Sequence, residues 1–180
     1  MKLQYLPNLL TAMRLALSLP IVIAIVYQEP LVAIALFFLA ALSDGLDGFL
    51  ARRYGWETRV GSMLDPLADK VLLVSAFLSL SFIDLIPFWL TLLVAGRDCL
   101  IMVGAMVYRS VVGRLDFQPS RLGKLCTLFQ LTLVLTAMIS MALEVSEPVV
   151  FLQPVVVLFT LGSGLHYVAD WSRKGWRHFH

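Results

Sequence analysis

The stretch LVAIALFFLAALSDGLDGFLAR, residues 31–52, joins a long uncharged and mostly apolar run to two aspartates and an arginine. A second acidic pair, Asp65 and Asp69, stands at the head of the next apolar segment. Ionisable groups at membrane depth are costly and are seldom kept there without a function. Carboxylates that converge are suited to divalent cations, which take oxygen ligands. The stretch therefore predicts a membrane helix that ends at a cation site.

The composition of the whole chain agrees with a membrane protein. Of its 180 residues, 59% are hydrophobic and 14% are charged, and the mean hydropathy is +0.85. The length accommodates about six spanning helices of ~20 residues each, so we expect a single transmembrane domain over residues 1–180. The net charge of +2 is too small to indicate a nucleic-acid surface. Cys99 and Cys126 lie in apolar stretches and predict no disulfide framework.

Six apolar segments separated by polar breaks indicate an all-α integral membrane protein with six transmembrane helices. The expected spans are Leu6–Tyr27, Leu31–Arg53, Pro66–Phe82, Leu85–Tyr108, Arg121–Leu143 and Val149–Ala169. Lys and Arg gather in the second and fourth connections and in the C-terminal tail, whereas the other connections carry only acidic charges. The positive-inside bias then predicts that both termini and the acidic cluster face the cytoplasm. We expect a multi-pass protein of the cell inner (cytoplasmic) membrane, or of the mitochondrial inner membrane in a eukaryote.

The spacing of the four aspartates places each pair on one helix face. Asp44 and Asp47 are separated by i,i+3, and Asp65 and Asp69 by i,i+4. Two antiparallel helices joined by a short connection can bring the pairs together, where bare carboxylates would repel one another. Bound Mg²⁺ or Mn²⁺ would remove this repulsion, and Arg52 adds a guanidinium suited to phosphate oxygens. We interpret the cluster as the site of an enzyme that handles a pyrophosphate-bearing lipid.

A second and less specific set of polar residues lies near the same end of the predicted helices. It comprises Asn8, Thr11, Arg14, Arg97, Asp98, Gly123, Lys124, Thr127 and Gln130. The residues alone leave two interpretations open for Arg14, Arg97 and Lys124, which can either reach the cytoplasmic headgroups or bind a ligand. Together these cations would surround the carboxylates with positive charge, which suits an anionic acceptor.

The spacing Asp44-x-x-Asp47-Gly48-x-x-Ala51-Arg52, eight residues, Gly61-x-x-x-Asp65-x-x-x-Asp69 resembles the full signature of the CDP-alcohol phosphotransferase family. Four shorter motifs are similar to its phosphatidylglycerophosphate synthase and cardiolipin synthase branches. They are Pro7-Asn8-Leu-Leu-Thr11-x-x-Arg14, Leu64-Asp65-Pro66-Leu-Ala-Asp69-Lys70, Arg97-Asp98 and Gly123-Lys124-x-x-Thr127-x-x-Gln130. Those branches use CDP-diacylglycerol as donor, and the family is usually homodimeric.

The resemblance implies a two-metal site that binds Mg²⁺ or Mn²⁺. Asp44, Asp47 and Asp65 would hold one ion, and Asp44, Asp65 and Asp69 would share a second. Asp69 would also be the general base that takes the proton from the acceptor hydroxyl. The residues implied to bind CDP-diacylglycerol are Asn8, Thr11, Gly48, Arg52, Thr58 and Gly61. The candidates for acceptor binding are Arg97 and Lys124.

The expected reaction is transfer of a phosphatidyl group from CDP-diacylglycerol to sn-glycerol 3-phosphate, which releases CMP and forms phosphatidylglycerophosphate. The alternative is a cardiolipin synthase with phosphatidylglycerol as acceptor, because Asp98 after Arg97 is more similar to that branch. A cation transporter is a different class, but it would need a polar path that stretches such as Leu31–Leu42 do not offer. An intramembrane prenyltransferase usually has adjacent acids in its aspartate-rich motif, whereas Asp44 and Asp47 are separated by two residues.

Overall fold

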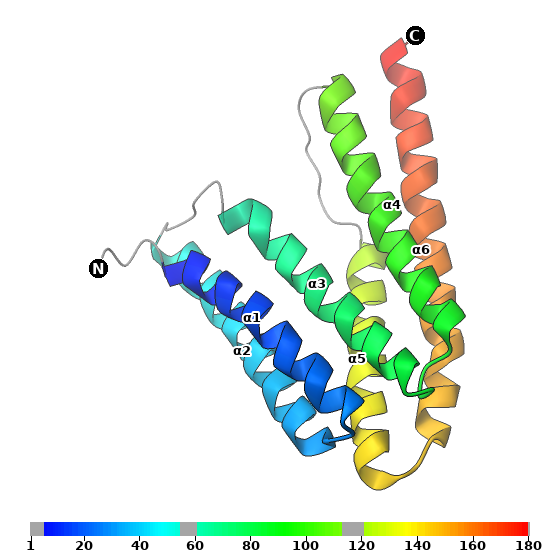
Figure 1. Ribbon diagram of the computed structural model, residues 1–180. Helices are drawn as coiled ribbons and strands as arrows, with labels where there is room; N and C mark the ends of the chain where they lie inside the picture. Colours follow the sequence, from blue (N-terminus) through cyan, green and yellow to red (C-terminus); the bar gives the residue numbers. More distant parts are fainter. Residues whose placement is uncertain (1–5, 55–60, 113–120, 180) are drawn as a thin grey trace.

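The computed structural model describes residues 6–54, 61–112 and 121–179, with side chains for residues 12–43, 45, 67–104, 106 and 121–169. These ranges form six helices and contain no strand, so the all-α prediction is confirmed. The helices are α1 (Leu6–Val26), α2 (Pro30–Tyr54), α3 (Gly61–Phe82), α4 (Phe88–Val112), α5 (Arg121–Leu143) and α6 (Glu147–Phe179). Figure 1 shows that successive helices run in alternating directions and that α4 and α6 stand side by side.

Five of the helices differ from the expected spans at one or both ends, and three of them, α3, α4 and α6, differ by more than one residue. Helix α3 begins at Gly61, so the prediction that it begins at Pro66 was wrong, and Asp65 and Asp69 both lie inside the helix. A proline removes one intrahelical hydrogen bond, and near a helix end this loss does not prevent further turns. Helix α4 begins at Phe88, directly after Pro87. Helix α6 continues past Ala169 to Phe179, because the apolar run ends at Ala169 but the helix does not.

Three tight turns close the helix pairs α1–α2, α3–α4 and α5–α6. Each turn contains one residue with positive φ, namely Gln28 (57°), Asp84 (59°) and Glu144 (55°). The next N–H along the chain donates back to the last turn of the helix, from Glu29 to Ala24 O, from Leu85 to Leu80 O and from Val145 to Ser140 O. This is the hydrogen bond of a Schellman C-cap, which satisfies carbonyls left open at a helix end.

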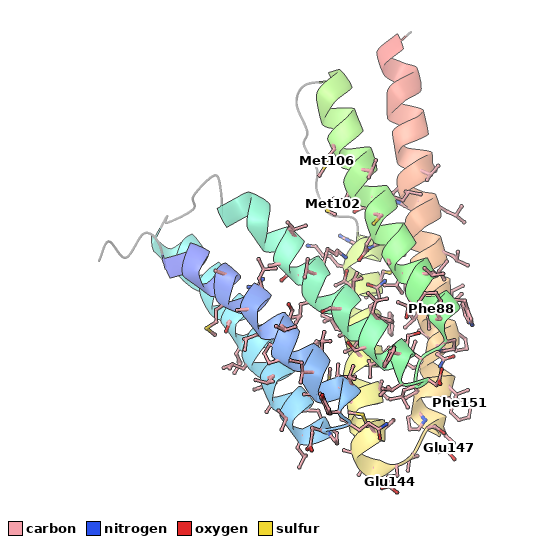
Figure 2. All side chains as sticks on the ribbon, in the orientation of Figure 1. Phe88, Met102, Met106, Glu144, Glu147 and Phe151 are labelled. Carbon is pink, nitrogen blue, oxygen red and sulfur yellow. The ribbon has the colours of Figure 1, made fainter. Side chains whose placement is uncertain are left out.

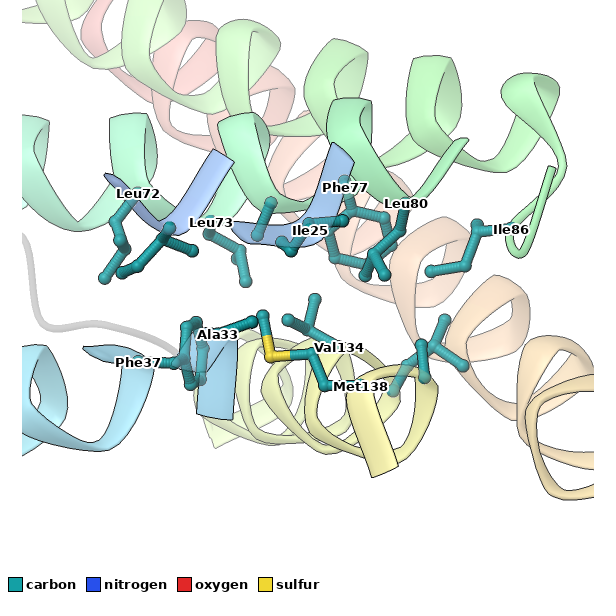
Figure 3. Close-up of a cluster of buried hydrophobic side chains, with 14 of the residues drawn as sticks. Ile25, Ala33, Phe37, Leu72, Leu73, Phe77, Leu80, Ile86, Val134 and Met138 are labelled. Carbon is teal, nitrogen blue, oxygen red and sulfur yellow. The ribbon is translucent and has the colours of Figure 1, made fainter. Parts of the chain in front are cut away.

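The core lies where α1, α2, α3 and α5 meet (Figure 3). Helix α1 packs against both α2 and α3, α5 packs against α6, and α4 contacts α3 and α6. Small residues such as Ala33 and Ala76 are fully buried and allow the helix backbones to approach closely. Phe77 and Leu80 of α3 are also fully buried in this core, so α3 lies at the centre of the fold.

The outer faces of the helices are strongly apolar. Phe88 and Phe151 are more than half exposed, and both are labelled on the outside of the bundle in Figure 2. In the described part of the chain, two helical segments are long and apolar enough to cross a membrane, Arg121–Leu143 and Glu147–Ala169. Shorter apolar helical segments cover Ala12–Val26 and Pro30–Ser43. Exposed apolar faces of this extent are typical of proteins that contact lipid or another protein.

Candidate functional site

A cavity of about 320 Å³ lies among α1, α2, α3 and α5. Its polar lining is formed by Arg14, Asp69, Lys70 and Thr127. Its apolar lining is formed by Phe37, Ala40, Ala41, Leu72, Leu73 and Leu131. The cavity meets α2 one turn before Asp44 and meets α3 at Asp69, so it adjoins both acidic segments. A molecule that carries both a charged and an apolar part matches this lining.

The polar end of the cavity contains an ion pair between α1 and α3. The Arg14 guanidinium donates from Nη1 to Asp69 Oδ1. Arg14 is only 1% exposed, whereas the Asp69 side chain is 50% exposed. The sequence left Arg14 either reaching the headgroups or binding a ligand, and its burial excludes the headgroup interpretation. Asp69, the residue expected to be the general base, is held by a cation from another helix and still faces open space.

A second charged network joins α3, α4 and α6 beside the cavity. Lys70 Nζ lies 2.6 Å from Asp98 Oδ2, and Arg97 Nη1 lies 2.6 Å from Asp98 Oδ1. Arg97 also donates from Nη2 to the buried Ser163 hydroxyl. Asp98 is thus shared by two cations, and the group has one more positive than negative charge. Of the two cations, Lys70 lines the cavity and Arg97 does not.

The predicted residues of α5 separate into two places. Lys124 is exposed, and Thr127, one turn later, lines the cavity while its hydroxyl donates to Gly123 O at 3.2 Å. Gln130 is fully buried and turns toward α6, where its Nε2 lies 3.3 Å from Cys126 Sγ and 3.5 Å from Thr160 Oγ1. Gln130 therefore belongs to the packing between α5 and α6.

Several predicted site residues lie outside the described side chains. Asp44, Asp47, Gly48 and Arg52 fall in α2, Gly61 and Asp65 fall in α3, and Asn8 and Thr11 fall in α1. Thr58 lies outside the described ranges altogether. The joining of all four carboxylates at one place therefore stays a prediction.

The donor chemistry of the signature fits a hard divalent cation. Among the side chains that the structure describes, no three His, Cys, Asp or Glu residues lie together in a group that could hold a metal ion. Asp69 is the one signature aspartate among these described side chains. Asp69 presents a half-exposed carboxylate to the cavity. Aspartate oxygens are the ligands that Mg²⁺ and Mn²⁺ prefer, so the residues present fit such ions.

Two features of this site were missed from the sequence. The first is the pairing of Arg14 with Asp69, and the second is the place of Lys70 in the cavity wall. The sequence held a signal for the first feature. A guanidinium within an apolar helix needs an anionic partner, and the acidic residues that could pair with Arg14 lie on other helices. Lys70 carried a weaker signal, since a lysine next to an aspartate at a helix end is usually solvated.

Comparison with known proteins shows which family this chain resembles. Residues 4–164 match the family model described as CDP-alcohol phosphatidyltransferase. The chain is 33% identical over 171 residues to a probable phosphatidylglycerophosphate synthase of Mycobacterium tuberculosis (strain ATCC 25618 / H37Rv), covering 91% of this chain and 80% of that protein. It is 40% identical over 127 residues to the CDP-diacylglycerol–glycerol-3-phosphate 3-phosphatidyltransferase of Aquifex aeolicus, covering 68% and 69%. It is also 41% identical over 105 residues to the cardiolipin synthase (CMP-forming) of Rattus norvegicus, covering 57% and 34%.

Proposed function

Because the chain belongs to the CDP-alcohol phosphatidyltransferase family and is an enzyme of that class, we propose that it transfers a phosphatidyl group from CDP-diacylglycerol to sn-glycerol 3-phosphate. The products are phosphatidylglycerophosphate and CMP. The observation that carries the donor assignment is the cavity, whose charged end holds Asp69 and whose walls are apolar. A lipid with a charged headgroup needs both surfaces at once. Two relatives support the acceptor: the Mycobacterium tuberculosis protein named as a probable phosphatidylglycerophosphate synthase and the Aquifex aeolicus protein named for glycerol 3-phosphate, of which 80% and 69% of the length match this chain.

The proposed reaction begins with the acceptor hydroxyl beside Asp69. The Asp69 carboxylate takes the hydroxyl proton, and the acceptor oxygen attacks the phosphorus that carries diacylglycerol. The bond from that phosphorus to the CMP oxygen breaks, and CMP leaves. Mg²⁺ or Mn²⁺ bound by Asp44, Asp47, Asp65 and Asp69 would neutralise the pyrophosphate and the charge that develops on CMP. Arg52, Gly48, Gly61, Thr58 and the Asn8–Thr11 segment are the proposed contacts of the CDP part.

Lys70 joins Arg97 and Lys124 among the proposed groups for the acceptor. Lys70 lines the cavity next to Asp69 and belongs to a network with one surplus positive charge. An ammonium in this position can meet the phosphate of an acceptor whose hydroxyl reaches Asp69. Arg97 acts on the same subsite through Asp98, because it holds the carboxylate that positions Lys70.

The proposed setting is a bilayer, with six transmembrane helices forming one domain over residues 1–180. The apolar outer faces support this arrangement, and the three tight turns rich in acidic residues lie at the end opposite to both termini. The distribution of Lys and Arg favours cytoplasmic termini and a cytoplasmic site, in the inner membrane of the cell. We also propose a homodimer, as in other members of the family.

A cardiolipin synthase is the second candidate function. It would use phosphatidylglycerol as acceptor and the same donor. The observation that favours it is the similarity to the rat cardiolipin synthase, at 41% identity over 105 residues. The ion pair of Arg97 with Asp98 is compatible with either acceptor, because both carry a phosphate group.

The test is CMP release by the purified full-length protein in detergent with CDP-diacylglycerol and Mg²⁺. Glycerol 3-phosphate and phosphatidylglycerol are supplied in separate reactions, with Asp69→Asn as the inactive control. Release with glycerol 3-phosphate alone supports the proposal, and release with phosphatidylglycerol alone replaces it with the second candidate. Release by neither acceptor would overturn both. Full activity of Asp69→Asn would remove Asp69 as the base.

A further inference from the structure

We propose that Arg14 is a positioning residue that holds the carboxylate of Asp69 in place for proton transfer. The inference rests on the proposed role of Asp69 as general base and adds a residue from a different helix to that role. Arg14 is a buried residue in the first half of α1, and its guanidinium donates to Asp69 Oδ1 at the cavity wall. The pair is therefore part of the surface that a substrate in the cavity would meet.

The burial of Arg14 makes it a fixed support. At 1% exposure its side chain is enclosed, while α1 packs closely against α3. A guanidinium does not lose its proton in proteins and donates from a rigid planar group, so the donor atom keeps both its charge and its place. Because Asp69 is half exposed, the contact with a buried guanidinium restricts the position of its carboxylate. Catalytic groups need a well-defined geometry, and a displacement of about 1 Å can cost about 100-fold in rate.

Lys70, the neighbouring cation, does not replace Arg14 in this role. The Lys70 ammonium contacts Asp98 of α4 at 2.6 Å. The two adjacent residues Asp69 and Lys70 are thus each held by a charge from another helix, Asp69 by α1 and Lys70 by α4. Loss of Arg14 is expected to affect the base and to leave the Lys70–Asp98 pair in place.

The first experiment tests the pairing without any activity measurement. Thermal unfolding in detergent is compared for the wild type, Arg14→Met, Asp69→Asn and the double variant. Each single variant removes the Arg14–Asp69 contact and should lower Tm, and Asp69→Asn also deprives the buried Arg14 guanidinium of that carboxylate charge. If the residues are coupled, the double variant should unfold at a higher temperature than the sum of the single losses predicts. Additive losses would overturn the inference.

The second experiment tests positioning. Arg14→Ala should lower kcat at least tenfold while the KM values for both substrates stay within about twofold, because the loss concerns the transition state. Guanidinium ion at millimolar concentration should restore part of kcat by entering the space left by the side chain. Arg14→Lys should retain more activity than Arg14→Ala, since a cation remains.

The matched control is Leu80→Ala, a fully buried core change on α3 away from the cavity lining. It should lower Tm through the cavity that it creates and keep kcat per folded enzyme, with no response to guanidinium. An unchanged kcat in Arg14→Ala, or equal guanidinium rescue of Leu80→Ala, would overturn the positioning role. If the wild type released no CMP with any acceptor, the proposed function would fail, and the Tm comparison would still decide whether Arg14 and Asp69 are coupled.

Discussion

Lys70 Nζ lies 2.6 Å from Asp98 Oδ2, and this contact joins the cavity wall on α3 to a buried carboxylate on α4. Asp98 receives a second cation, Arg97, on its other oxygen at 2.6 Å. One carboxylate therefore serves two cations, and Lys70 remains partly exposed at 28% on the cavity side. Lys70 therefore offers positive charge to an anion in the cavity, and its contact with Asp98 restricts the position of the ammonium group.

Removal of the Lys70 charge should weaken acceptor binding. We expect Lys70→Met to raise the KM for glycerol 3-phosphate about tenfold, equivalent to ~1.4 kcal/mol, because a charge-assisted contact to the phosphate is lost. The KM for CDP-diacylglycerol should change less. The measurement is steady-state CMP release with each substrate varied in turn. The control is Thr91→Val, which removes a buried hydroxyl of α4 that donates to Phe77 O at 3.3 Å away from the cavity lining. A larger effect of Lys70→Met on the donor would place the acceptor elsewhere.

Removal of the Asp98 charge should destabilise the fold. Asp98 is buried and holds both Arg97 and Lys70. In Asp98→Ala the buried Arg97 keeps its charge without that carboxylate, and breaking such a pair typically costs 3–5 kcal/mol. We expect a clear fall of Tm in detergent, measured by thermal unfolding. Asp98→Glu retains the charge and should fall less. A Tm equal to that of the wild type in Asp98→Ala would mean that the network contributes little to stability.

The helices could be predicted from the sequence, whereas the pairing of charges between helices could not. The helices were predictable because apolar runs of about membrane length admit few alternatives, and only ends such as Pro66 were misplaced. Which charges pair was not predictable, since pairing depends on how the helices pack and not on spacing along one helix. Arg14 illustrates the limit: its sequence position allows contact with lipid headgroups, whereas α1 turns it inward to Asp69. The family signature identified Asp69 but gave no partner for it.

Metal removal should abolish activity and lower stability together. We expect the four signature aspartates of α2 and α3 to converge, where bare carboxylates would repel one another; among the described side chains, Asp69 lines the cavity. We expect EDTA to eliminate CMP release and Mg²⁺ or Mn²⁺ to restore it. The second readout is Tm, which should rise with metal concentration because a ligand that binds the folded state stabilises it. The metal-dependent rise should be much smaller in Asp65→Asn. Full CMP release in excess EDTA would exclude a metal requirement.

The turn between α5 and α6 offers a stability test that does not involve the site. Glu144 adopts φ of 55° at the C-terminal end of α5, and Val145 N donates to Ser140 O beyond it. A left-handed conformation costs a residue with a side chain about 1–2 kcal/mol, and an acidic side chain at a helix C-terminus opposes the helix dipole. Glu144→Gly should therefore raise Tm by a few degrees without changing kcat. Val145→Gly is the matched control: its φ is not in the left-handed region, so added backbone freedom should lower Tm. If both glycine variants shifted Tm in the same direction, backbone strain at Glu144 would not explain the effect.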